Sequence, residues 1–127
     1  MQKLIFVVDD NDANLTMAAL VLEAEYRVLT MPSAPKMLAL LEKKQPDMIL
    51  LDIEMPDMTG FEAIVQLKEH SEWKNIPVIF LTGRNDDSVM SEGLQLGAID
   101  FIHKPILPAA LMNRVRNYLE LIEHRKA

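Results

Sequence analysis

Short apolar runs alternate along this chain with segments whose apolar residues recur at helical spacing. The runs are LIFVV at 4–8, YRVLT at 26–30, MILL at 48–51, VIFLT at 78–82 and AIDFIH at 98–103. The segments that follow them predict five helices, the last of which runs from about 108 to 126. Strands that alternate with helices form a parallel sheet with helices on both faces. The sequence therefore predicts an α/β fold.

The second run indicates how the strands are ordered. Its apolar and polar residues alternate, which is typical of a strand with one face in water and places it at an edge of the sheet. Right-handed crossovers leave few topologies, and the flavodoxin-like order 2-1-3-4-5 has the second strand at an edge. We predict a doubly wound, five-stranded parallel sheet with five helices, in one domain that spans residues 1–127.

The composition excludes several classes of protein. A chain of 127 residues suits one domain, and it has no run of about 18 apolar residues that could span a membrane. Its N-terminus lacks the long apolar stretch of a signal peptide, and the absence of cysteine excludes disulfides and thiolate metal sites. The formal net charge of −6 argues against direct binding to nucleic acid. We expect a cytoplasmic protein.

Polar side chains stand at the carboxyl ends of four predicted strands. The first strand ends in Asp9 and Asp10, the third in Asp52, the fourth in Thr82 and the fifth in Lys104. Ligands of open parallel sheets bind beyond these ends. Because the four strands are neighbours in the predicted order, three carboxylates, a hydroxyl and an ammonium are expected in one crevice.

This set of groups suits phosphoryl transfer. Three close carboxylates repel one another, and a divalent cation relieves the repulsion. Ligation by oxygen alone, with few carboxylates, favours Mg²⁺. Lys104 offers a charge for an anionic oxygen and Thr82 a hydrogen bond. Asp52 ends the central strand between the acidic pair and Lys104, so it is the best nucleophile.

Each of these residues also has a simpler interpretation. Asp9 and Asp10 could cap the first helix, Asp52 could start a turn, and Lys104 could be a surface charge. Thr82 is a common strand residue. Only their predicted convergence favours a functional site, and that convergence depends on the strand order.

Four motifs together resemble the receiver domain of two-component response regulators. They are VVDDN at 7–11, LLDIEMP at 50–56 with Gly60 after it, FLT within 79–82 and HKP at 103–105. Each motif is weak alone, but their order on the predicted strands is specific, and the resemblance covers about residues 3 to 120. It implies a bacterial signalling protein that is a stoichiometric phosphoacceptor and not an enzyme.

The resemblance also implies roles for single residues. Asp52 would accept a phosphoryl group from the phosphohistidine of a sensor histidine kinase or phosphotransfer protein. Asp10 and Asp52 would bind Mg²⁺ directly, Asp9 through water, and Glu54 through its backbone carbonyl. Lys104 would contact the phosphoryl group.

A switch is implied as well. Thr82 would bond a phosphoryl oxygen and move with it, and Pro105 would fix the loop after the lysine. Phe101 stands where a switch aromatic turns inward on activation, although a plain core position is an equal alternative. The surface of the fourth helix, fifth strand and fifth helix would then regulate an output domain or a downstream protein. A homodimer through this surface is a further option.

Some residues depart from the usual pattern. Thr59 stands where an Asp often precedes the glycine of this loop. Arg84 and Glu54 vary between members, and they could pair with each other or gate the attacking water. The last helix ends without a glycine stop, so it either frays or leads into an absent output domain.

Two other functions remain as alternatives. An aspartate-based phosphohydrolase also uses a strand-end Asp, Mg²⁺ and a Lys, but it normally has a second Asp two residues on, where this chain has Glu54. A non-phosphorylated interaction module would keep only the fold. Loss of the Asp, the Lys or the acidic pair typically marks such a module, and this chain has all of them.

Overall fold

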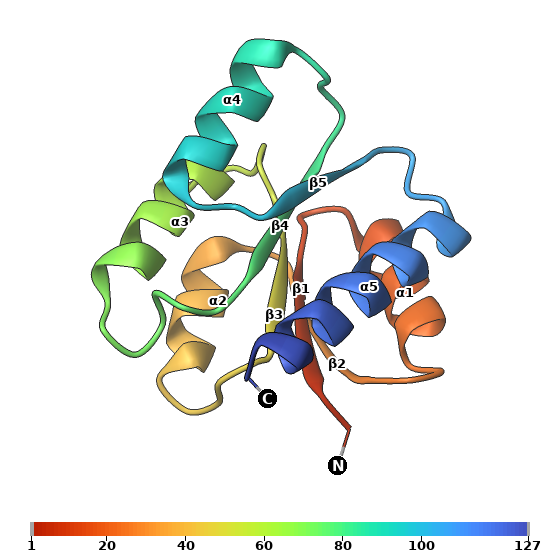
Figure 1. The fold of residues 1–127 in the computed structure, drawn as a ribbon. Coiled ribbons are helices and arrows are strands. Elements are labelled where there is room, and N and C mark those ends of the chain that lie inside the picture. Colours follow the sequence, from red (N-terminus) through yellow and green to blue (C-terminus); the bar gives the residue numbers. More distant parts are fainter. Residues whose placement is uncertain (1, 127) are drawn as a thin grey trace.

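The computed structural model describes residues 2–126 and contains one five-stranded parallel sheet between two layers of helices (Figure 1). The elements in chain order are β1 (Leu4–Val8), α1 (Asp12–Leu22), β2 (Arg27–Met31), α2 (Ala34–Leu41), β3 (Met48–Asp52), α3 (Gly60–Glu69), β4 (Val78–Thr82), α4 (Asp87–Leu96), β5 (Asp100–His103) and α5 (Pro108–Lys126). The strand order is β2-β1-β3-β4-β5, and every neighbouring pair is parallel. The predicted flavodoxin-like topology is confirmed.

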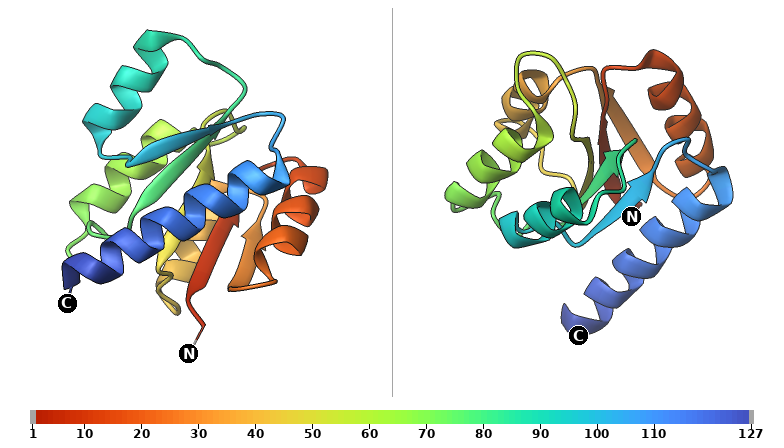
Figure 2. Two further views of the ribbon diagram at one scale, coloured as in Figure 1. Left: turned by 45° about the vertical axis from the view of Figure 1, so that its right-hand side comes forward. Right: turned by 90° about the horizontal axis from the view of Figure 1, so that it is seen from above.

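The two faces of the sheet carry separate apolar cores. Alternate side chains of β1 point to opposite faces, so Ile5 packs with Leu15 of α1 and Leu111 of α5, whereas Phe6 packs with Met37 of α2. Figure 2 shows α1 and α5 on one face, with α2, α3 and α4 on the other. β1, β3 and β4 are buried along their whole length because helices cover both of their faces.

β2 begins and ends one residue later than the sequence pattern indicates. The pattern places Tyr26 in the strand, but its N–H donates to the carbonyl of Leu22 at 2.9 Å and closes the turn after α1. At the other end Met31 pairs with Val8 and is buried. The middle of the strand is partly exposed, which confirms its position at the edge of the sheet.

β5 is shorter than predicted because its first residues cap the preceding helix. Gly97 ends α4 in the left-handed conformation, with φ 116°. The next residue, Ala98, donates its N–H to the carbonyl of Gly93 at 3.1 Å. The chain joins β4 only at Ile99, so the strand starts two residues later than its apolar pattern.

Several helix ends follow the expected chemistry. Ser33 caps α2 by accepting a hydrogen bond from the N–H of Lys36, and Pro35 lies in the first turn. Thr59 caps α3 in a capping box with Glu62, in which each side chain accepts from the backbone of the other residue. Within residues 2–126, no helix combines the length and apolar character that a membrane span needs.

Candidate functional site

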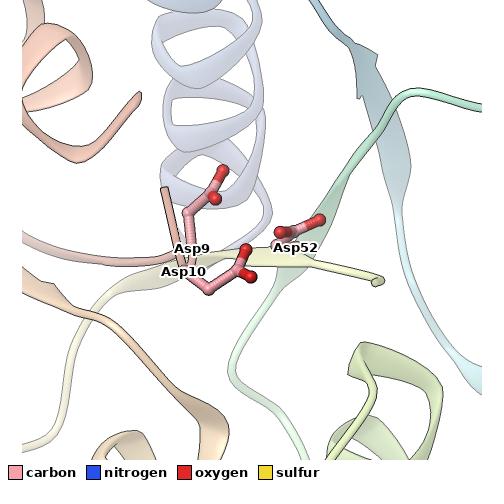
Figure 3. Close-up of side chains that lie close together, drawn as sticks. All are labelled: Asp9, Asp10 and Asp52. Carbon is pink, nitrogen blue, oxygen red and sulfur yellow. The ribbon is translucent and has the colours of Figure 1, made fainter. Parts of the chain in front are cut away.

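Three carboxylates meet beyond the carboxyl ends of β1 and β3. Asp9 and Asp10 follow β1 directly, and Asp52 is the last residue of β3. Pairing of β1 with β3 brings these ends together, and Figure 3 shows the three side chains beside one another. One oxygen from each carboxylate lies within 4.8 Å of the others, so the cluster could hold a metal ion. Asp9 and Asp52 are buried, whereas Asp10 is exposed.

Lys104 bridges the two buried carboxylates. Its Nζ lies 3.1 Å from Oδ2 of Asp9 and 3.2 Å from Oδ2 of Asp52. Its backbone N–H donates to the carbonyl of Thr82 at 2.8 Å, which extends the pairing of β4 with β5 to the residue that carries the ammonium. Burial by itself lowers the pKa of Lys104, but the two carboxylates outweigh this effect and raise the pKa above its usual value.

Asp52 is the least well satisfied side chain of the site. Lys104 contacts its Oδ2 as an ion pair, but this buried oxygen accepts no hydrogen bond from the described part of the chain. Burial raises the pKa of the Asp52 carboxyl from 3.8 to about 7, and the charge of Asp9 acts in the same direction. The attraction of Lys104 offsets only part of this shift. A cation or an electrophile at Oδ2 would lower the free-energy cost of burying this negative charge.

Asp9, in contrast, is held firmly by the start of α1. Its Oδ1 accepts the N–H of Asn11 at 2.9 Å, and its Oδ2 accepts from Nδ2 of Asn14 at 3.1 Å. Asn11 is the N-cap of α1, so the simpler interpretation that Asp9 or Asp10 caps this helix is wrong.

Asn14 was not singled out from the sequence. The signal was its position three residues after the capping Asn11, on the first turn of a helix that starts beside the acidic pair. Only the bend of the chain between β1 and α1 turns its side chain back toward Asp9.

The loop from β3 to α3 is packed tightly against the carboxylate it follows. The N–H of Gly60 donates to the carbonyl of Ile53 at 2.7 Å. A Cβ on residue 60 would lie 2.9 Å from the Cα of Ile53 and still closer to the carbonyl oxygen of Asp52, so only glycine fits. Asp57 has a positive φ of 71°, and Glu54 points into solvent. Thr59, the departure noted in the sequence, serves as the N-cap of α3.

Thr82 and Arg84 face one another across the start of the β4–α4 loop. The Thr82 hydroxyl is buried, accepts the N–H of Arg84 at 2.9 Å and donates to its carbonyl at 3.2 Å. The side chain of Arg84 forms an ion pair with Asp86. The idea that Arg84 pairs with Glu54 is therefore wrong, because Glu54 only adds a weaker charge effect that raises the pKa of the arginine, after the hydrogen bond and charge of Asp86.

Phe101 is already turned inward. Its side chain is 2% exposed, and its ring centroid lies 5.8 Å from that of Phe80 in the core beneath α4. Pro105 follows Lys104 through a cis peptide bond at the surface. The structure thus brings the carboxylates of Asp9, Asp10 and Asp52 within 4.8 Å of one another, with Lys104 in ion pairs to Asp9 and Asp52. It places Phe101 in the separate core under α4.

The fold and this acidic site are those of the receiver class of signalling domains. Residues 5–116 match the family described as response regulator receiver domain, and this chain belongs to that family. The structure of the chemotaxis protein CheY4 from Vibrio cholerae superposes with a TM-score of 0.88 at 30% identity, covering 92% of this chain and 98% of that one.

Two curated relatives are much longer than this chain. Response regulator PleD of Caulobacter vibrioides is 40% identical over 92% of the chain, and a probable cyclic di-GMP phosphodiesterase of Vibrio cholerae is 37% identical over 91%. The chain spans 26% of the length of each. Membership of the family makes this a domain of phosphorylation-based, two-component signalling, and it favours that function over the phosphohydrolase alternative.

The raised pKa of Asp52 predicts that the contribution of this side chain to the free energy of unfolding depends on pH. The folded state holds the Asp52 proton more tightly than the unfolded state, so this contribution to stability is full below pH 3.8. It declines as the pH rises and is lost above about 7. Asp52→Asn keeps the side chain neutral. It should raise the free energy of unfolding of the metal-free protein by about 2–4 kcal/mol at pH 8, and by much less near pH 4.

Urea unfolding in the presence of a chelator would measure this difference at both pH values. Glu54→Gln is the matched control, because it removes an exposed charge from the same loop and should change stability little at either pH. An equal gain for Asp52→Asn at both pH values would show that the buried charge is not its cause.

Proposed function

We propose that Asp52 accepts a phosphoryl group from the phosphohistidine of a sensor histidine kinase or phosphotransfer protein. The observation that carries this assignment is the buried Oδ2 of Asp52, which accepts no hydrogen bond from residues 2–126 and lies between the acidic pair and the ammonium of Lys104. In the reaction, one carboxylate oxygen of Asp52 forms a bond to phosphorus as the bond from phosphorus to the histidine nitrogen breaks, and the other oxygen stays available to a metal ion. The product is an acyl phosphate, so the domain acts once per phosphoryl group and not as an enzyme on an external substrate.

Mg²⁺ fits the donors that are present. All of these donors are oxygens. The Oδ2 of Asp52 accepts no hydrogen bond from residues 2–126, and the carboxylate of Asp10 is exposed, so both can coordinate a cation. Both oxygens of Asp9 already accept hydrogen bonds, which favours contact through water. Glu54 would add its backbone carbonyl. When bound, Mg²⁺ would neutralise charge on the phosphoryl oxygens.

Lys104 and Thr82 complete the proposed site. Lys104 would leave Asp9 and contact a phosphoryl oxygen, because a doubly charged phosphoryl group attracts the ammonium more strongly than one carboxylate does. Asn14 would remain with Asp9 and keep its Oδ2 satisfied. The hydroxyl of Thr82 would give up the carbonyl of Arg84 to donate to the phosphoryl group, and Pro105 would hold the loop after Lys104.

Phosphorylation would act on partners through the surface formed by α4, β5 and α5. A local charge event at one end of the sheet would bias a two-state element, which includes Thr82 and Phe101, and so change that surface. The partner would be an output domain or a downstream protein, and a homodimer through the same surface is one form of output. The similarity to PleD and to the phosphodiesterase, both from bacteria, supports a bacterial setting. The formal net charge of −6 argues against direct binding to nucleic acid, and we propose that the domain acts in the cytoplasm and away from the membrane.

The assignment of Asp52 predicts a single labelled residue. Treatment with acetyl phosphate and Mg²⁺ should add one phosphoryl group to the intact protein, and Asp52→Asn should abolish the addition. Asp57→Asn is the matched control, since it neutralises an exposed acid in the same loop and its left-handed backbone suits asparagine. Intact-mass spectrometry reports the result. A label that persists in Asp52→Asn would refute the assignment.

Lys104→Ala should separate metal binding from the response of the surface. Removing the ammonium takes away a charge that competes with Mg²⁺, so the dissociation constant for Mg²⁺ should stay the same or fall. The phosphorylation-dependent NMR shifts of α4 and β5 should be largely lost. Lys3→Ala, which removes an ammonium paired with Glu123 away from the site, is the control. A full response in Lys104→Ala would mean that another residue couples the two sites.

Asn14→Leu should weaken Mg²⁺ binding without touching a ligand. The substitution keeps the size of the side chain but removes the donor that orients Asp9, and loss of such an outer contact typically costs about tenfold in metal affinity. Isothermal titration calorimetry would measure the change, with the exposed Asn113→Leu on α5 as control. An unchanged dissociation constant would show that Asn14 serves only the helix start.

A further inference from the structure

Gly93 lies at an unexpected place, in the interior of α4 and buried against the core. Glycine is a poor helix former, so a glycine here costs stability unless the space is needed. A Cβ at this position would lie 2.6 Å from Cζ and 3.1 Å from Cε2 of Phe101, and 3.2 Å from Cδ2 of Phe80. The rings of Phe101 and Phe80 therefore reach into the volume that a side chain at this position would occupy.

From this contact we propose that Gly93 is a positioning residue that holds the ring of Phe101 inward before any phosphorylation. The inference rests on the proposed switch function, because it concerns the ring that this function uses. In the switch that the family resemblance implies, Thr82 moves toward the phosphoryl group and vacates the space into which the ring of Phe101 turns. In this structure the hydroxyl of Thr82 is hydrogen-bonded to the backbone of Arg84, and yet the side chain of Phe101 is buried, with only 2% of it exposed.

The space that Gly93 leaves explains why an inward ring of Phe101 does not require movement of Thr82. Phe101 packs its ring tip over Gly93 and tilts against Phe80, which also makes an edge contact with the ring of Phe61. These contacts lie between α4 and the sheet, on the face that α2, α3 and α4 cover. Because none of them involves the hydroxyl of Thr82, the ring can stay inward whether or not Thr82 moves.

The consequence concerns what phosphorylation can change. A modification shifts a two-state equilibrium only as far as it favours one state over the other. If the ring is inward in both forms, the surface of α4 and β5 already has its ring-in arrangement in the unphosphorylated protein. A partner that recognises this arrangement binds with little dependence on phosphate at Asp52, and Thr82 and Lys104 account for the remaining response.

The test follows the ring directly by fluorine NMR of the full chain labelled with 4-fluorophenylalanine. The chain has four phenylalanines, and a Phe101→Leu variant identifies the resonance of Phe101. Without phosphodonor, this resonance should report a buried ring, with a small shift between H₂O and D₂O. Gly93→Ala should move it to a solvent-exposed position. Gly83→Ala is the matched control, because a Cβ there meets no atom within 4 Å.

A stability comparison covers the case in which Gly93→Ala folds poorly. The substitution should lower the midpoint of thermal unfolding when Phe101 is present, because the methyl group displaces the ring. In a Phe101→Ala background it should raise the midpoint, since alanine is the better helix former and the ring is gone. A change of the same sign in both backgrounds would show that Gly93 serves helix packing alone and would overturn the proposal.

The remaining outcomes are also decisive. An exposed Phe101 resonance in the unmodified chain, or a buried one in Gly93→Ala, contradicts the assignment. Addition of acetyl phosphate and Mg²⁺ should shift the resonance little in the original chain, and little in Gly93→Ala because the methyl group still fills the space of the ring. The mass of the same samples reports whether Asp52 is phosphorylated, so a failure of the proposed phosphoacceptor is distinguished from a failure of Gly93 to position the ring.

Discussion

The sharing of one ammonium between two buried carboxylates is the interaction on which the site depends. Lys104 lies within 3.2 Å of both Asp9 and Asp52, and one positive charge cannot satisfy two negative charges in a poorly solvated place. Asn11 and Asn14 donate hydrogen bonds to Asp9, but among residues 2–126 no donor bonds the Oδ2 of Asp52. Burial, together with the charge of Asp9, raises the pKa of Asp52, and the single ammonium offsets only part of this shift.

The apolar core beneath α4 shows how a glycine can determine the position of an aromatic side chain. By resemblance Phe101 stands either at a switch position, whose ring turns inward on activation, or at a plain core position. The contact with Gly93 makes the inward position compatible with a Thr82 that still bonds its own loop. Lys104 and the pairing of β4 with β5 form a physical connection between the site and the α4–β5 surface that does not pass through the ring of Phe101.

Much of the fold could be predicted because hydrophobic periodicity acts over a few residues. The five strands and the start of α2 at Ser33 are examples in which local chemistry agrees with the tertiary structure, whereas the cap of α3 by Thr59 was seen only in the structure. The errors at Tyr26 and Ala98 arise where an apolar residue near a strand is used by a helix end instead. Apolar character does not distinguish these two uses, because both bury the side chain.

The sequence by itself determined which groups stand at the strand ends, because strands of this length carry Asp52, Thr82 and the acidic pair to the same edge once the order is right. Tertiary structure alone decided how those groups are satisfied: that Asn14 turns toward Asp9, that Arg84 pairs with Asp86, and that Phe101 rests on Gly93. Such contacts depend on where loops and helices place side chains in space, and a spacing along the chain does not specify that.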